Sequence, residues 1–104
     1  MERRVTVQLM RVAVVLMADP HGRFYGYPLS KAAKVRSGIL YPMLDRMLAD
    51  GWLTDEWELP GERANTKPRR YYTLTDLGRR ELGAVEARAL EDERVPPGLS
   101  WGAP

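Results

Sequence analysis

Cysteine is absent from the 104-residue sequence, and histidine occurs only once. The absence of cysteine excludes disulfides, zinc–thiolate sites and thiol catalysis. The single histidine, His21, lies in an Asp-Pro-His-Gly turn without other metal ligands clustered beside it, so it is interpreted as a solvated loop residue. Catalysis by a nucleophile also requires a base and an orienting group, and no convincing set is present. The sequence therefore predicts a protein that is not an enzyme and that holds no metal or cofactor.

Long apolar runs are also missing. The run Val12–Ala18 is much shorter than the roughly 18 residues that a membrane span requires, and Arg11 and Asp19 flank it. No small-residue cleavage site follows this run, so a signal peptide is not expected. The composition, with 44% hydrophobic and 29% charged residues, is that of an ordinary globular domain. We expect a single cytoplasmic domain with no membrane partner, small enough to gain stability by pairing with a second copy.

The net charge is only +2, but the charges are unevenly distributed along the chain. Residues 23–46 carry five bases and one acid, residues 47–58 carry four acids and no base, and residues 59–75 carry four bases and one acid. Two basic segments flank an acidic one, which predicts a polarised surface.

Apolar periodicity predicts three helices in the first half of the chain. The first, Thr6–Ala18, is apolar on two faces and is expected to contact both its own core and another subunit. The second is a short helix within Tyr25–Val35. The third is placed from Gly38 or Ile39 to Gly51, because Pro42 should lie where its missing N–H is not needed.

The second half predicts a hairpin, a last helix and a tail. An aromatic-rich strand (residues 52–59), a polar turn (60–68) and a second strand (69–75) are followed by a helix that Thr75 caps and that reaches about Arg94. The order of helix, helix, turn, helix, hairpin and helix is typical of a winged helix-turn-helix, a mainly α fold with a two-stranded β wing. We assign residues 1–75 to this DNA-binding domain, 76–94 to a C-terminal dimerisation helix and 95–104 to a flexible tail, in which Trp101 is a candidate for docking.

The segments YGYPLSKAAKV, SGILYPMLDRMLADGWLTDEWE and RRYYTLTDLGRREL, in this order, closely resemble the PadR family of bacterial transcriptional regulators, and the similarity covers roughly Leu9 to Leu82. The resemblance, here to the short-chain branch of the family, implies a homodimer joined through the first and last helices that represses by occupying promoter DNA. It also implies a small aromatic effector, for which the sequence itself offers no supporting residues. The candidate dimer contacts are Leu9, Leu82, Val85 and Leu90.

The candidate DNA contacts lie in the second and third helices and in the wing. They are Tyr27, Lys31, Lys34, Arg36, Ser37, Gly38, Tyr41, Arg46, Arg63, Lys67 and Arg69. Amides at a helix N-terminus and basic side chains can bind phosphates, and Arg63 could enter a narrow minor groove. Several of these residues also have a plainer interpretation: Ser37 as a helix cap, Tyr41 as a core residue, and the bases as solvated surface.

The wing aromatics Trp52, Trp57, Tyr71 and Tyr72 suggest either stacking on a single-stranded nucleic acid or, as we favour, cross-strand pairs that hold the wing to the core. The acids of this region suggest either a metal site or, as we favour, a face of the wing that is turned away from phosphates; they are Asp50, Asp55, Glu56 and Glu58. The resulting hypothesis is a sequence-specific regulator that binds a palindromic operator on double-stranded DNA. The alternative is a winged helix used as a protein-interaction module.

Overall fold

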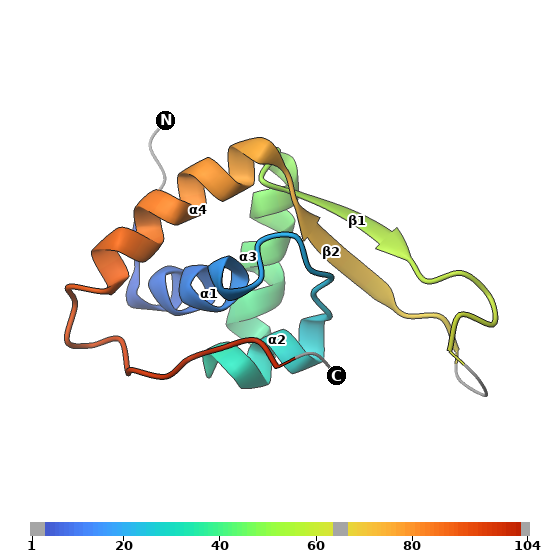
Figure 1. Cartoon of the computed structure of the whole chain (residues 1–104), viewed down its shortest axis with the longest axis horizontal. Coiled ribbons are helices and arrows are strands. Elements are labelled where there is room, and N and C mark those ends of the chain that lie inside the picture. Colours follow the sequence, from blue (N-terminus) through green and yellow to red (C-terminus); the bar gives the residue numbers. More distant parts are fainter. Residues whose placement is uncertain (1–3, 64–66, 103–104) are drawn as a thin grey trace.

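The computed structural model describes residues 4–63 and 67–102. Four helices and a two-stranded antiparallel sheet account for the regular structure of these residues (Figure 1). Their order and bounds are α1 (Val7–Ala18), α2 (Gly26–Ala33), α3 (Ser37–Ala49), β1 (Leu53–Trp57), β2 (Arg70–Leu74) and α4 (Asp76–Ala89). The predicted mainly helical fold with a β wing is therefore confirmed.

Helix α1 forms the centre of the core, because α4 packs on one side of it and α2 on another. The Thr6 side chain caps this helix by accepting a hydrogen bond from the Leu9 backbone N–H at 3.0 Å. Much of its apolar surface is buried within the protomer itself, whereas Val7 and Val14 are only partly buried. The buried residues are Leu9, Met10, Val12, Ala13, Val15 and Leu16. Arg11 extends to the end of α2, where its guanidinium donates to the Lys34 carbonyl oxygen at 3.2 Å.

Helix α3 begins at Ser37, which is one or two residues earlier than predicted. Pro42 consequently lies inside the helix and not in its first turn. A proline at this position cannot donate to the carbonyl four residues earlier, which is that of Gly38. The prediction assumed that the missing N–H would set the start of the helix, but the helix tolerates this loss one turn further in.

The strands of the wing pair in a register that places Leu53 opposite Leu74 and Trp57 opposite Arg70. Leu53 and Leu74 are buried at the root of the hairpin, whereas the far end projects away from the helices (Figure 1). A short backbone bridge between Phe24 and Tyr72 joins β2 to the segment before α2. The Phe24 nitrogen lies 2.9 Å from the Tyr72 oxygen, and the Tyr72 nitrogen lies 2.8 Å from the Phe24 oxygen. The predicted turn over residues 60–68 includes 64–66, which lie outside the described residues.

Helix α4 is joined to the start of the wing by its capping residue. The Thr75 hydroxyl accepts from the Gly78 N–H at 2.9 Å and donates to the Gly51 carbonyl at 2.6 Å. The helix ends at Ala89, so the predicted extension to about Arg94 was too long. Beyond it, the Asp92 carboxylate accepts the Arg94 side chain and backbone N–H, which lowers the pKa of Asp92 to about 2. A side chain that binds local backbone in this way favours a turn over a helix.

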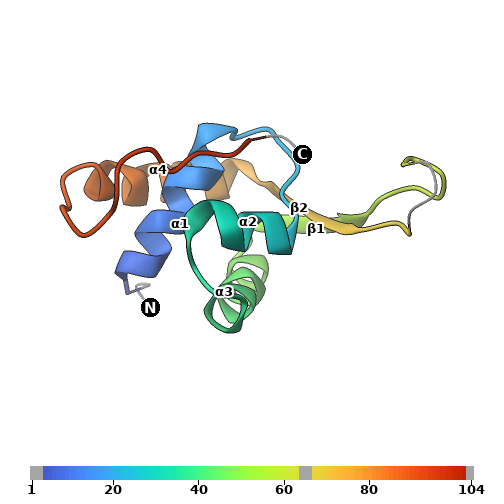
Figure 2. The same cartoon turned by 90° about the horizontal axis from the view of Figure 1, so that it is seen from below.

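The segment after α4 runs back across the helices (Figures 1 and 2). Leu99 is buried in the main core, and the Trp101 ring lies 4.9 Å from the ring of Phe24, centroid to centroid. Trp101 therefore docks on the core, as the sequence suggested that it could. This part of the tail, which was predicted to be flexible, contributes to the core. Within residues 4–63 and 67–102, none of the helices is both long and apolar enough to cross a membrane.

Candidate nucleic-acid interface

At the first turn of α3, both the backbone N–H groups and the side chains are accessible to solvent. Its N-cap is Arg36, whose side chain makes no capping hydrogen bond, and Ser37 and Gly38 are the first two helical residues. Ser37 is therefore not the cap, which removes the plainer interpretation of this residue. All three residues are exposed. The initial amides of a helix have no carbonyl partner within it and carry the positive end of its dipole, so this turn can accept an anion.

Tyr41 lies one turn further along α3 and contacts α2. A Cβ atom added to Gly26 would lie 2.7 Å from both Cε1 and Cζ of the Tyr41 ring, and closer still to its hydroxyl oxygen. Glycine at this position is what allows the ring to lie across the start of α2. The ring nevertheless remains 41% exposed, so packing and contact with a ligand are both compatible with its geometry.

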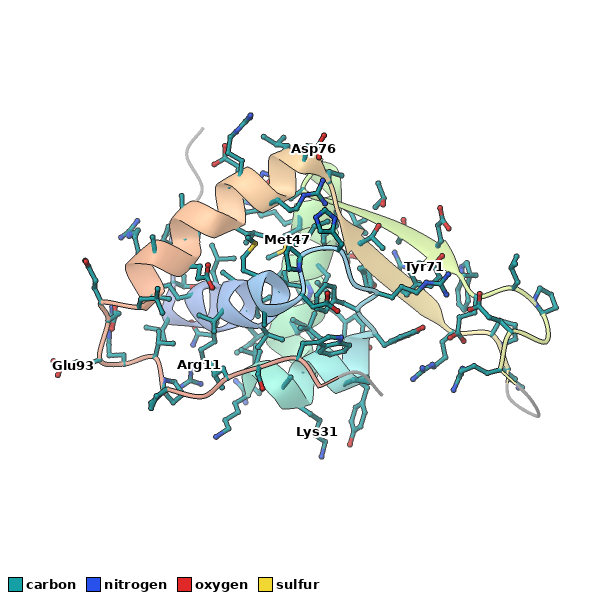
Figure 3. All side chains as sticks on the ribbon, viewed as in Figure 1. Arg11, Lys31, Met47, Tyr71, Asp76 and Glu93 are labelled. Atoms are coloured by element: carbon teal, nitrogen blue, oxygen red, sulfur yellow. The ribbon has the colours of Figure 1, made fainter. Side chains whose placement is uncertain are left out.

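The predicted bases of α2 and of the following turn point into solvent. Lys31 projects from α2 away from the core (Figure 3), and its ammonium nitrogen lies 5.2 Å from the centre of the Tyr27 ring. Lys34 ends α2 in a left-handed conformation, with φ of 56°, and is also exposed. Lys34 and Arg36 lie within three residues of Ser37, in the exposed turn that leads into α3. Arg46 lies apart from them, in the last turn of α3, with its Nε 3.9 Å from Asp50.

The wing contains a buried carboxylate, Glu58, that sequence reasoning did not single out for this role. Its oxygens accept the Tyr25 hydroxyl at 2.9 Å, the Arg63 Nε at 3.0 Å and the Arg69 backbone N–H at 2.8 Å. Burial by itself would raise the pKa of Glu58, but these hydrogen bonds outweigh burial and lower it. Only 4% of Glu58 is exposed. Glu58 is thus a buried, hydrogen-bonded residue of the wing, and the orientation of its face relative to phosphates stays a prediction.

Two of the predicted wing contacts, Arg63 and Arg69, converge on Glu58. The guanidinium of Arg69 also stacks 3.8 Å above the centre of the Tyr25 ring, and that of Arg63 donates to the Lys67 carbonyl at 3.3 Å. Both guanidinium groups therefore have partners within the chain. Lys67, the remaining predicted wing contact, has an exposed side chain.

Successive side chains in a strand point to opposite faces, so the wing has two different surfaces. The Glu58 face includes Glu56, which accepts the Tyr71 hydroxyl at 2.9 Å. The other face carries Asp55 and, opposite it, Tyr72, followed by the cross-strand pair of Trp57 and Arg70.

The four aromatics of this region differ in burial, and the difference does not follow the two faces. Trp52, Tyr71 and Tyr72 are buried, as expected of residues that hold the wing to the core. Trp57 does not follow this prediction, because 66% of it is exposed.

Comparison with known proteins identifies the family of this chain. The model of the transcriptional regulator PadR-like family matches residues 15–84, which extend from the middle of α1 through α2, α3 and the wing into α4. The chain belongs to the PadR-like family. The resemblance in the sequence is thereby confirmed.

Individual relatives of this PadR-like chain agree with the family match. It is 39% identical over 75 residues to the transcriptional regulator Rv3488 of Mycobacterium tuberculosis, covering 71% of the present chain and 65% of Rv3488. A PadR family transcriptional regulator from Eggerthella lenta is 31% identical with a TM-score of 0.58, covering 79% of this chain and 74% of that one. A PadR family regulator from Clostridium difficile is 20% identical and shares the fold, with a TM-score of 0.61 over 86% of this chain and 92% of that one.

The predicted dimer contacts of the PadR-like chain are distributed unequally between core and surface. Leu9, Leu82 and Val85 are buried where α1 and α4 pack within one protomer, whereas 77% of Leu90 is exposed. Leu9 and Val85 also line the floor of a groove of about 570 Å³ between these helices and the end of α3. Three of the four residues are thus accounted for by the core of the protomer, and their role between subunits stays a prediction.

Proposed function

We propose that this PadR-like protein is a sequence-specific regulator that binds double-stranded DNA. The observation that carries the proposal is the exposed start of α3. It has free helix-end amides at Ser37 and Gly38, and the exposed bases Lys31, Lys34 and Arg36 precede it in the chain. In a winged helix-turn-helix, this end of the third helix enters the major groove. Family membership supports the same function, since the matching family is one of transcriptional regulators.

The residues divide by the kind of contact that their chemistry allows. Lys31, Lys34 and Arg36 would neutralise phosphates, which gives affinity without sequence preference and makes binding dependent on salt. The amides at Ser37 would hold a phosphate or a groove edge at the helix dipole. Tyr41 would place its hydroxyl one turn deeper, at the position that Gly26 leaves open.

We further propose that the protein acts as a homodimeric repressor on a palindromic operator. Two copies related by a two-fold axis would place their α3 helices in major grooves about one helical turn apart. The exposed Leu90 at the end of α4 and the groove beside α1 are available for contact with a second subunit. Occupying the promoter would then exclude the polymerase.

The test is a titration of a fluorescent duplex that carries the protein's own upstream region, with competitor DNA and at several salt concentrations. Arg36→Ala should weaken binding to all sequences and reduce the salt slope by about 1, because one phosphate contact is lost. Arg80→Ala is the matched control, since it removes the same charge from an exposed position on α4. Equal losses for the two variants would show general charge attraction without a defined site. Absence of binding even at low salt would favour a protein-interaction module.

A further inference from the structure

Two large apolar side chains of the wing are left in solvent. Trp57 ends β1 and is 66% exposed, and Leu59 follows two residues later with 70% exposed. Leaving a tryptophan ring in water forfeits the free energy that burial would supply. The Tyr71 ring, a neighbour on the opposite face, shows that this hairpin has room to bury an aromatic side chain. The exposed position of Trp57 therefore calls for a partner outside the chain.

The strand register shows which side of the molecule the Trp57 ring faces. Directly opposed residues share a face, so Trp57 lies with Arg70, which pairs with Asp55 at 2.6 Å. Burial by itself would lower the pKa of Arg70, but the hydrogen bond and charge of Asp55 outweigh burial and raise it overall, and Asp45 of α3 adds to this increase. The pKa of Tyr72, on the same face, is raised by burial and, to a smaller extent, by Tyr41 and Asp45 of α3.

The opposite face of the wing is turned toward the C-terminal segment. Glu58, Arg63 and Arg69 line one cavity together with Trp101 from that segment. Figure 2 agrees, because α3 lies on one side of the strands and the C-terminal segment lies on the other. A duplex that received α3 in its major groove would consequently meet the Trp57 face of the wing and not the arginines gathered at Glu58.

We propose that Trp57 is a DNA-contacting residue of the wing, with its ring packed against the deoxyribose edge of the groove next to the one that α3 occupies. This inference rests on the proposed DNA-binding function. Minor-groove and architectural proteins insert apolar side chains at base steps, and such contacts need no charge. Arg70, opposite Trp57, is already paired with Asp55, so the contact made by Trp57 is expected to be mainly apolar. On the other face of the wing, Glu58 and its partners Arg63 and Arg69 hold the hairpin in place.

The experiment compares Trp57→Ala, Trp57→Phe and the control Thr54→Val by titration of the same duplex at several salt concentrations. Thr54 is exposed on the same strand but on the other face. We expect Trp57→Ala to bind roughly tenfold more weakly with an unchanged salt slope, since it removes apolar surface and no charge. Trp57→Phe should retain most of the affinity, and Thr54→Val all of it. A thermal unfolding curve close to that of the unaltered protein would confirm that Trp57→Ala folds.

Acrylamide quenching provides a second readout that does not depend on affinity. Trp57 is the most exposed of the three tryptophans, so bound duplex should protect the unaltered protein from quenching and should have little effect on Trp57→Phe. Full affinity in Trp57→Ala, with the unaltered protein binding normally, would refute the contact and leave the function intact. Failure of the unaltered protein to bind would instead overturn the function as well. If protection of Trp57 from acrylamide increased with protein concentration in the absence of DNA, the ring would be covered by a second copy of the chain, and the proposal would be overturned.

Discussion

Two glycines of α4 provide a matched pair of substitutions with opposite expected effects. A Cβ atom at Gly78 would lie 2.8 Å from the carbonyl carbon of Trp52 and 3.0 Å from its Cα, and closer still to its carbonyl oxygen. A Cβ atom at Gly83 would meet only the end of Met17, at 3.7 Å, which is an ordinary contact. Both residues lie inside the same helix, so the intrinsic preference for alanine is similar at the two positions.

The magnitudes follow from the two environments. Gly83→Ala should stabilise the protein by about 0.5–1 kcal/mol, which is the gain in helix propensity. At Gly78 the same gain is outweighed by overpacking against backbone, which costs about 1–3 kcal/mol and cannot be relieved by a rotamer change. Moving α4 away would also weaken the hydrogen bonds from Thr75 to the carbonyls of Gly51 and Trp52, each contributing about 1 kcal/mol. The net expectation for Gly78→Ala is a loss of about 2–3 kcal/mol.

Urea denaturation followed by circular dichroism measures both free energies of unfolding. The protomer concentration must be the same for all variants, because a dimer would make stability depend on it. The two variants should differ by about 3 kcal/mol, with the unaltered protein between them. A Gly78→Ala variant as stable as Gly83→Ala would refute the argument that close contact with Trp52 requires glycine at the start of α4.

Two further predictions concern the interface and the wing. Gly26→Ala should lower stability by about 1–2 kcal/mol, because the new methyl group displaces the Tyr41 ring. A double-mutant cycle tests this, since the loss should disappear in a Tyr41→Ala background. Equal losses in both backgrounds would contradict a close contact between Gly26 and the Tyr41 ring. Because the pKa of Glu58 is lowered in the folded state, its contribution to stability is present above its unfolded pKa and is lost as the pH falls through the lowered value. Glu58→Gln should therefore be less stable at neutral pH and lose stability less steeply as the pH falls below about 4.5, and parallel acid unfolding curves would argue against this role.

The helical part of the fold was predictable because its signals are local. Thr6 and Thr75 each cap a helix as expected, and the apolar stripe of α3 is buried through Leu40, Leu44 and Met47. The predicted helix ends were wrong where residues outside the local sequence pattern determine the conformation. Pro42 lies inside α3, because the helix tolerates the loss of one hydrogen bond. The end of α4 was placed too late, since charge and alanine content do not reveal the turn that Asp92 and Arg94 form.

The wing shows most clearly why the site was harder to predict than the fold. Alternation along a strand separates residues into two groups, but it cannot show which group faces the third helix. That choice depends on the pairing register and on the elements packed behind the hairpin, both of which involve residues distant in the sequence. Arg63 and Arg69 were therefore expected to face DNA because of their charge, whereas their guanidinium groups are turned toward Glu58. Trp57 was expected to hold the wing to the core because of its apolar ring, yet 66% of it is exposed, on the face that it shares with Arg70.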